Sequence, residues 1–582
     1  MYVLLIASAF NSLTQRVHAE LRDRGHRVAV ELALPGACLA DAVRGHRPDL
    51  VLAPMLRTAL PEEVWAAHTC LIVHPGPVGD RGPSSLDRAI QDGESRWGVT
   101  VLQANAEMDA GDVWASASCP VPPVGKSDLY RGEIADAALE AVLLAVERFA
   151  SGTYTPQPQT EGRARPLLRQ EERRIDWEND TTEDVLRALR AADSQPGVRD
   201  DDLLGGEWFL HGGHREEHLR GRPGELLATR TGALCRATAD GAVWIPELRA
   251  RRRPGGPAAP KLPAALALAD RLPPLPERPA PPHSGPHRRT WSDIGYHEEG
   301  QAGFLAFSFP GGAMSTAHCR RLLDAYRDAL TRPTTVLVLG GGRDFFSNGI
   351  HLGVIEAAAD PAEESWANIN AMNDLVEAVL TTTDRLVVSA LGGNAAAGGA
   401  MLALAADEVW CRSGVVLNPH YRLMGLHGSE YWTYTLPRRV GPVLAERLTA
   451  EALPLSAASA QELGLADRTV PCAPGDFTGE TERLAVRLAA LPATASRIAG
   501  KKAARERDEA LRPLAAHREA ELALMRQTFF DPDASYHALR RAFVRKESPA
   551  ATPAHLARAA AVRPRGVTGL AAPDAARGPD CC

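Results

Sequence analysis

The sequence lacks three features that would assign it to a simple class. Its nine cysteines form no Cys-x-x-Cys pair, which argues against a zinc site or a disulfide framework and favours a reducing, cytoplasmic setting. The most apolar internal stretch, AAAGGAMLALAAD, is far shorter than a membrane span. The opening residues, MYVLLIASAF, have no basic segment before their short apolar part, so we expect a first strand and not a signal peptide.

Charge is also not in excess. The net charge is −7, with 24% charged and 45% hydrophobic residues, which is ordinary for a soluble globular protein. Nothing in this balance attracts the chain to nucleic acid or to a membrane surface, and we expect neither as a partner. The 582 residues are too many for one hydrophobic core, so we expect three or four domains.

Strands alternate with helices in the first part of the chain, over residues 1–160. This alternation predicts an open, mostly parallel, Rossmann-like α/β sheet, in which ligands bind outside the carboxyl ends of the strands. The expected strands are YVLLI, RVAVELAL, PDLVLAPML, CLIVHPG and GVTVLQAN.

The rest of the chain divides by changes of composition. Residues 161–254 have short strands cut by glycine turns and predict a small β-rich module. Residues 255–291 are dense in proline and arginine, so we expect an extended linker. Residues 292–485 again alternate strands and helices, and residues 486–546 are helical throughout. The tail, 547–582, has few large apolar residues, and we expect it to be disordered.

A histidine ends the fourth expected strand, in CLIVHPGPVGDRGPSSLDRAI. His74 is followed by a loop rich in glycine and proline, and the fifth strand leads to MDAGDV. A histidine and an aspartate at neighbouring strand ends form a plausible acid/base pair, and MDAGDV offers Asp109 and Asp112 as the possible partners of His74. The alternative is a histidine that fills a loop and an aspartate that caps a turn.

This region resembles the 10-formyltetrahydrofolate-dependent formyltransferases and hydrolases. Their Asn-x-His-Pro stretch and later Asp-x-Gly-Asp match IVHPGPVGDRG and MDAGDV, and RRIDWENDTTEDVLRALRAADSQPGV resembles the start of their C-terminal module. The resemblance covers about residues 1–250 and implies 10-formyltetrahydrofolate as one-carbon donor, with His74 and Asp112 as catalytic residues. The family's asparagine falls on Ile72, so the amide that would help to hold the formyl oxygen is missing.

Two glycine-rich stretches, GRDFFSNGIHL and LGGNAAAGGAMLALAADEVW, mark the later α/β region. Each places small residues where a backbone amide can face a carbonyl oxygen, although a tight strand–helix turn would need glycine as well. Together they resemble the crotonase (enoyl-CoA hydratase/isomerase) superfamily. The resemblance implies coenzyme A as a ligand and the amides of Ile350 and Gly398 as an oxyanion hole.

The crotonase-like region departs from the hydratases of that superfamily. Their two catalytic glutamates fall on Met401 and His420, so water addition to an enoyl chain is not expected. A polar cluster, NPHYRLMGLHGSEYWTY, follows instead, and we take Tyr421 and Glu430 as the lead acid/base candidates. The alternative for this cluster is an ordinary surface loop.

Some other signals are weaker. The close histidines of HGGHREEH, from His211 to His218, are separated by glycines, so we expect a solvated loop and no metal site. Arg131 and Arg540 are candidates to bind the phosphates of CoA, although a surface salt bridge is the commoner fate of such residues.

A formyltransferase-like domain fused to a crotonase-like domain resembles the HypX/HoxX family of hydrogenase maturation factors. FNSLTQR, HPGPVGDRGPSSLD, FFSNGIHL and GVVLNPHY fit that family. The resemblance implies carbon monoxide synthesis: a formyl group passes from folate to CoA, and formyl-CoA is then decarbonylated. It implies hydrogenase precursor or iron-ligand assembly proteins as partners. Three alternatives stay open: a formyltetrahydrofolate hydrolase, an acyl-CoA lyase or hydrolase, and a non-catalytic assembly scaffold.

Overall fold

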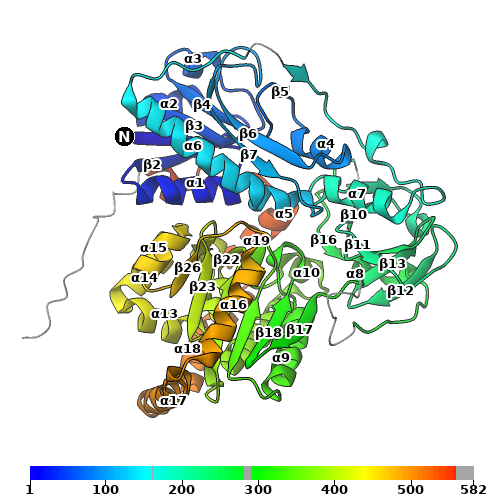
Figure 1. Cartoon of the computed structure of the whole chain (residues 1–582), viewed down its shortest axis with the longest axis vertical. Helices are drawn as coiled ribbons and strands as arrows, with labels where there is room; N and C mark the ends of the chain where they lie inside the picture. The colour runs from blue at the N-terminus through cyan, green and yellow to red at the C-terminus, as the bar shows by residue number, and fades with distance from the viewer. Residues whose placement is uncertain (160–161, 253, 281–289, 559–582) are drawn as a thin grey trace, which may run out of the picture.

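The computed structural model describes residues 1–159, 162–252, 254–280 and 290–558. Figure 1 shows an α/β domain at the top, a second α/β domain below it and a small β-rich module beside both. The prediction of an α/β multidomain protein is therefore confirmed.

The first domain is built on a six-stranded sheet with the order β2-β1-β3-β4-β6-β7. Strands β1 to β4 are parallel, as predicted, whereas β6 is antiparallel to β4 and to β7. The expectation of a mostly parallel sheet is thus right for the first four strands and wrong for GVTVLQAN. The strands are β1 (Tyr2–Ala7), β2 (Arg27–Leu32), β3 (Leu50–Met55), β4 (Cys70–His74), β6 (Arg96–Gln103) and β7 (Val113–Pro120). The helices are α1 (Ser12–Asp23), α2 (Leu39–His46), α3 (Glu62–Trp65), α4 (Ser85–Gln91), α5 (Lys126–Arg131) and α6 (Glu133–Ser151).

Both faces of this sheet are covered, which explains the unbroken apolar run of β1. Val3 and Leu5 point into a core shared with α1 and α6. Leu4 and Ile6 point the other way, into a core shared with α2 and α3. Helices α1 and α6 lie on the face of the first domain that is turned toward the second domain (Figure 1).

The β-rich module contains two four-stranded sheets, with the orders β16-β15-β10-β9 and β11-β14-β13-β12. The predicted linker at 255–291 is partly wrong, because β16 (Lys261–Pro263) pairs with β15 and α8 (Ala264–Leu268) packs into the module's core. The apolar stretch AALALADRL finds a surface to cover there, which a proline-based prediction does not anticipate. Residues 281–289 of this segment lie outside the described residues. The other elements are α7 (Thr182–Ala192), β9 (Val198–Asp200), β10 (Trp208–His211), β11 (His214–Glu216), β12 (Leu226–Arg230), β13 (Ala233–Ala237), β14 (Ala242–Ile245) and β15 (Glu247–Ala250).

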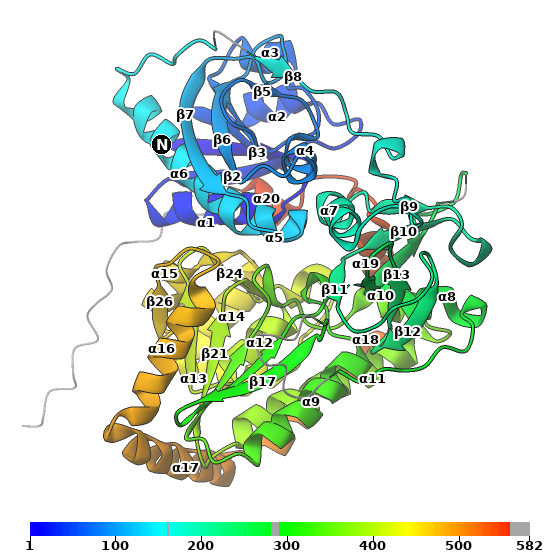
Figure 2. The same cartoon turned by 45° about the vertical axis from the view of Figure 1, so that its right-hand side comes forward.

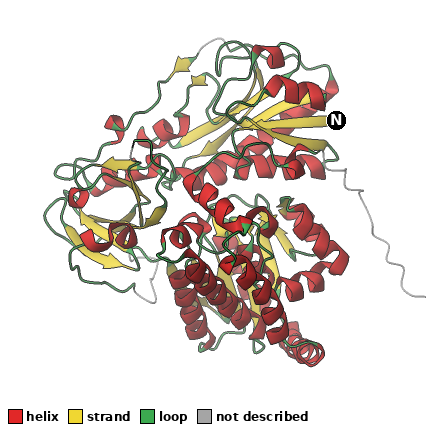
Figure 3. Ribbon diagram, turned by 180° about the vertical axis from the view of Figure 1, so that it is seen from behind, coloured by secondary structure: helices red, strands yellow, loops and turns green. Residues whose placement is uncertain are grey.

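The second domain has a six-stranded sheet, β17-β18-β19-β21-β23-β26, and a smaller one, β20-β22-β24-β25. One face of the large sheet packs on α9 and α11, and the other on α16. The strands are β17 (Ile294–Glu299), β18 (Ala302–Phe307), β19 (Val336–Gly340), β20 (Phe345–Ser347), β21 (Leu386–Leu391), β22 (Asn394–Ala396), β23 (Glu408–Arg412), β24 (Val416–Asn418), β25 (Leu455–Ser456) and β26 (Arg468–Val470). The helices are α9 (Thr316–Leu330), α10 (Leu352–Ala357), α11 (Pro361–Thr381), α12 (Gly398–Leu404), α13 (Trp432–Val440), α14 (Pro442–Glu451), α15 (Ala457–Glu462), α16 (Phe477–Ala490), α17 (Ala493–Leu511), α18 (Leu514–Phe530) and α19 (Ser535–Arg545). Seen from behind, helices cover this domain (Figure 3).

The expectation of a disordered tail from 547 onward is wrong for residues 547–558. This segment returns to the first domain and ends in the short helix α20 (Ala554–Ala557), next to β2 (Figure 2). Leu556 is buried in the first domain's core, and the Thr552 hydroxyl accepts from the backbone N–H of Leu32 at 2.9 Å. The prediction from composition failed here because the segment has only one large apolar residue, Leu556, among many small and polar ones. Residues 559–582 lie outside the described residues.

Ion pairs and hydrogen bonds join the two α/β domains. Asp136 on α6 lies between Arg16 of α1 and Arg412 of β23, at 2.5 and 2.9 Å. Asp23 on α1 accepts hydrogen bonds from the hydroxyls of Ser456 and Ser459. These contacts hold the two domains against each other.

Candidate active sites

His74 lies at the carboxyl end of β4, with only 4% of its surface exposed. Its Nε2 is 3.0 Å from Oδ2 of Asp80, which lies six residues later in the same loop. A Cβ on Gly76 would come within 2.4 Å of this Nε2 and 2.5 Å of the Asp80 carboxylate. The loop therefore needs glycine at this position so that the imidazole and the carboxylate can meet.

Asp80 is the partner that the sequence did not single out. Burial raises its pKa, but hydrogen bonds from His74 and Ser85 and the positive charge of Arg165 outweigh burial, so the pKa is lowered overall. A deprotonated Asp80 can only accept, so Nε2 of His74 carries the hydrogen in this bond. In the neutral ring Nδ1 is then left as the basic nitrogen.

Asp109, and not Asp112, faces that nitrogen. Oδ2 of Asp109 lies 3.6 Å from Nδ1 of His74 and accepts from the backbone N–H of Gly82 at 3.2 Å. Asp112 is exposed, and the structure does not bring its side chain to His74. The structure does not support Asp112 as the partner of His74: Asp112 directly precedes β7, whose Val113 pairs with Leu102, whereas Asp109 lies in the loop before it.

The two predicted oxyanion-hole amides lie close together in the second domain. A Cβ on Gly349 would come within 3.0 Å of the Gly398 nitrogen, so the Ile350 and Gly398 segments touch through glycine. Met314 donates to the Gly349 carbonyl at 2.8 Å and fixes the first segment. Within the described part of the chain, the amides of Ile350 and Gly398 donate to no protein acceptor. Two backbone donors are thus available to a ligand.

Tyr421 and Glu430, predicted as a pair, are in direct contact. The Tyr421 hydroxyl donates to Oε2 of Glu430 at 2.9 Å, and both side chains are buried. A Cβ on Gly398 would come within 2.1 Å of Oε1 of Glu430, so this carboxylate lies against the second oxyanion-hole residue. The prediction of a polar cluster at a site, and not a surface loop, is the one that fits this burial.

Burial dominates the proton affinity of both groups. Burial raises the pKa of Glu430 to about 7; the hydrogen bond from Tyr421 opposes this rise, and the charge of Glu521 adds to it. Burial and the neighbouring Glu430 hold the pKa of Tyr421 well above its usual range. Tyr421 therefore remains a hydrogen-bond donor at neutral pH, while Glu430 can both release and accept a proton.

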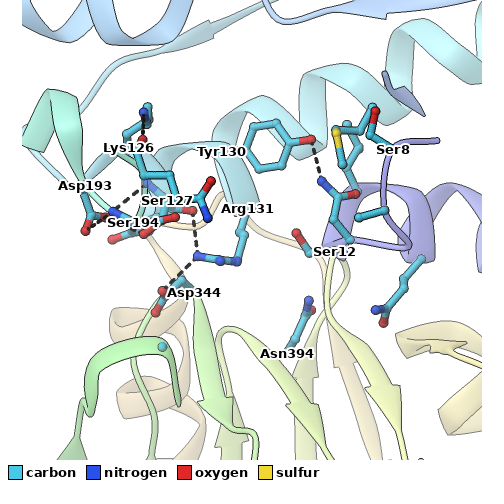
Figure 4. A pocket seen from close by; sticks show the side chains of 18 of the residues that line it. Ser8, Ser12, Lys126, Ser127, Tyr130, Arg131, Asp193, Ser194, Asp344 and Asn394 are labelled. Atoms are coloured by element: carbon cyan, nitrogen blue, oxygen red, sulfur yellow. Dashed lines mark hydrogen bonds and ion pairs between the residues drawn. The ribbon is translucent and has the colours of Figure 1, made fainter. Parts of the chain in front are cut away.

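Both sites open into one continuous cavity of about 2230 Å³. Its wall includes His74 and Asp109 at one end and Ile350, Gly398 and Glu430 at the other. A common cavity, which the sequence did not reveal, thus adjoins both sets of residues. Figure 4 shows the part of the cavity that lies between the two domains, where Ser12 of the first domain lies above Asn394 of the second.

Arg131 lines this part of the cavity. Its Nη1 is 3.3 Å from Oδ2 of Asp344 in the second domain, and its guanidinium lies over the ring of Phe345 (Figure 4). Arg540 does not line the cavity: its buried guanidinium pairs with Glu356 at 3.0 Å. The prediction of Arg540 as a CoA ligand is therefore not supported in this conformation. Arg57 and Lys546, which the sequence did not suggest, do line the cavity, and neither forms an ion pair with a described residue.

Two smaller predictions are corrected or left aside. HGGHREEH is not wholly a solvated loop, because His211 ends β10 in the module's interior and His214 begins β11. Met401, at one of the hydratase glutamate positions, is fully buried in α12. In the described residues no helix is long and apolar enough to span a membrane.

Comparisons with known proteins agree with this division. The formyl transferase family matches residues 36–146, the formyl transferase C-terminal domain matches 167–256, and the enoyl-CoA hydratase/isomerase family matches 310–550. A methionyl-tRNA formyltransferase of Variovorax paradoxus is 28% identical over 40% of this chain and 72% of its own. The chain thus joins a formyltransferase to an enoyl-CoA hydratase-like domain, a content that implies an enzyme.

Two relatives match nearly the whole length. Hydrogenase maturation factor HoxX of Bradyrhizobium diazoefficiens is 46% identical over 97% of this chain and 99% of its own. The crystal structure of HypX from Aquifex aeolicus in complex with tetrahydrofolic acid is 44% identical, with a TM-score of 0.92 over 95% of this chain and 98% of that one. The chain belongs to the HypX/HoxX family of hydrogenase maturation factors.

Proposed function

We propose that this chain makes carbon monoxide for hydrogenase maturation in two steps. The formyl group of 10-formyltetrahydrofolate passes to the thiol of CoA beside His74, and formyl-CoA is then decarbonylated beside Glu430. The observation that carries the proposal is the single cavity that holds both sites. The tetrahydrofolic acid in the Aquifex structure supports folate as the ligand of the first domain.

The cavity wall near His74 fits a folate. Leu86, Val99 and Leu102 provide an apolar surface for a flat ring, and the backbone around Asp109 provides polar groups. Apolar walls with a few placed polar groups are typical of such sites. Ile72 also lines this part, so the family's asparagine is replaced by an apolar side chain.

In the first step His74 acts as base and then as acid. Nδ1 accepts the proton of the CoA thiol, and Asp109 stabilises the positive charge that develops on the ring. A carbon–sulfur bond forms at the formyl carbon, and its bond to the folate nitrogen N10 breaks. His74 returns the proton to N10, so the nitrogen leaves as a neutral amine and no water is consumed.

CoA needs cations for its phosphates and room for its pantetheine arm. Arg131, which lines the cavity between the two domains, would supply that charge together with Arg57 and Lys546 elsewhere on the cavity wall. Because the cavity is continuous, the thioester end can move from His74 to Glu430 while the phosphates remain bound.

In the second step the amides of Ile350 and Gly398 donate to the formyl oxygen, as in an oxyanion hole. Formyl-CoA has no α-carbon, so enolate chemistry is excluded. The carboxylate of Glu430 accepts the formyl hydrogen as a proton, the carbon–sulfur bond breaks and its electron pair goes to sulfur. Glu430 then returns the proton to sulfur, which gives CO and free CoA. Tyr421 holds the carboxylate in place.

One assay separates this function from its alternatives. The pure protein is incubated with 10-formyltetrahydrofolate and CoA, and CO is followed with a haem reporter. Formate without CO would indicate a formyltetrahydrofolate hydrolase. Turnover of other acyl-CoA substrates without folate turnover would indicate a lyase or hydrolase. No turnover of any kind would indicate an assembly scaffold that binds a hydrogenase precursor or an iron-ligand assembly protein.

A further inference from the structure

A second buried carboxylate lies behind Glu430. Glu521 belongs to α18, in the helical extension for which the sequence analysis predicts no role, and none of its surface is exposed. Helix α18 packs against both α11 and α13. A fully buried charged side chain is costly unless its partners compensate for the lost water, so its contacts need an explanation.

Glu521 accepts hydrogen bonds from the residues that flank Glu430. Its Oε2 accepts from the backbone N–H of Tyr431 at 2.9 Å, and its Oε1 accepts from the backbone N–H of Thr433 at 2.9 Å and the Thr433 hydroxyl at 2.6 Å. The backbone groups can only donate, and each takes a different oxygen. Burial raises the pKa of Glu521, whereas these hydrogen bonds favour its ionised form; as a carboxylate it caps the first turn of α13 from another helix.

The turn that Glu521 holds is an unusual one. Glu430 and Tyr431 both have φ of 58°, in the left-handed region that side chains other than glycine rarely adopt. Asn373 on α11 accepts from the backbone N–H of Glu430 at 3.0 Å and supports the turn from the other side. Without this conformation the Glu430 carboxylate would not lie against Gly398, so the surrounding contacts must maintain it.

We propose that Glu521 is a positioning residue for the second site: it holds the Glu430–Thr433 turn in its strained form and places a second negative charge behind the Glu430 carboxylate. This inference rests on the proposed function of that site. It assigns a task to helix α18.

The ionisable groups around Glu430 are few. Tyr421 donates to it from the 3-10 turn after β24, and the buried Cys319 thiol on α9 is close enough to be affected by its charge. His420 lies on the cavity wall, and α11 presents the neutral Asn373. Next to Glu521, His517 contacts the Thr433 hydroxyl at 2.9 Å, while Glu377 of α11 is paired with Arg518. No cation faces Glu430 among these groups, so the charge of Glu521 is not neutralised on that side.

The test uses the full chain and synthetic formyl-CoA, so that the first step is bypassed. Glu521→Gln removes the charge and one of the two acceptor oxygens. We expect kcat for CO formation to fall about 10-fold to 100-fold with KM little changed, because the turn loosens. We also expect the ascending limb of the pH profile to move down by about one pH unit, because a like charge is lost. Glu519→Gln, at an exposed position of the same helix, is the matched control and should change neither quantity.

A second variant separates charge from position. Glu521→Asp keeps the charge but shortens the side chain, so kcat should fall while the pH limb stays in place. If Glu521→Gln does not fold, the kcat of Glu521→Asp is the test of the positioning role. A kcat equal to that of the wild type would then overturn the inference. If wild type makes CO but both variants keep its kcat and pH limb, the positioning role is wrong. If wild type makes no CO from formyl-CoA, the proposed function fails and the inference falls with it.

Discussion

Nδ1 of His74 lies 3.6 Å from Oδ2 of Asp109, while Nε2 of the same ring contacts Asp80 at 3.0 Å. The two carboxylates therefore have different tasks. Asp80 fixes the tautomer and orientation of the ring, and Asp109 is placed to stabilise the charge that the ring acquires when it takes a proton.

Asp109→Asn should lower formyl transfer from folate to CoA by about 10²-fold to 10⁴-fold, since the imidazolium loses its counter-charge. Formation of formyl-CoA by the purified protein measures this directly. Asp112→Asn is the matched control, because Asp112 is exposed in the same loop, and its rate should stay near wild type. The reverse result, with Asp112→Asn inactive and Asp109→Asn active, would show that the loop binds substrate in another arrangement.

Tyr421→Phe should spare formyl transfer and reduce CO formation by about 10²-fold or more, because the carboxylate of Glu430 loses the hydroxyl that holds it. The two half-reactions are measured separately, formyl-CoA by chromatography and CO with a haem reporter. CO output at the wild-type level would remove Tyr421 from the second site.

The sequence allowed the prediction of this second site better than of the first. Tyr421 and Glu430 are nine residues apart and are in contact, and the family resemblance of two glycine-rich motifs implied Ile350 and Gly398, whose segments touch. Asp80 meets His74 because of the conformation of the loop after β4, and Asp109 reaches it from the loop after the antiparallel strand β6; no local pattern predicts either contact. In the same way, the apolar runs predicted most strands, whereas the return of residues 547–558 to the first domain depends on long-range contacts of Thr552 and Leu556.

The pH dependence of the second step follows from Glu430. Its pKa is raised to about 7, so it is protonated below that pH and a carboxylate above it. Since the carboxylate is the base, CO formation from formyl-CoA should rise with pH, with a midpoint near 7, and be about tenfold lower at pH 6 than on the plateau. A rate that falls through this range would mean that the protonated form of Glu430 is the active one.

A bulky side chain in the cavity between the two domains should uncouple formyl transfer from decarbonylation without stopping either reaction. Ser12 lines the cavity there, so Ser12→Trp is expected to leave formyl-CoA formation and the decarbonylation of added formyl-CoA largely intact. CO formation from 10-formyltetrahydrofolate and CoA together should fall at least about tenfold, since the thioester must move past residue 12 to reach Glu430. Glu147→Trp, at an exposed position of α6, controls for the new side chain. Unchanged coupled activity in Ser12→Trp would indicate that formyl-CoA leaves the protein between the steps.

The most direct test follows the carbon itself. The pure protein is given 10-formyltetrahydrofolate labelled with ¹³C in the formyl group, together with CoA, and the products are identified by mass spectrometry. The account predicts one ¹³CO for each tetrahydrofolate formed, with CoA regenerated, and no labelled product from His74→Ala. Labelled formate without labelled CO from the wild-type protein would contradict it.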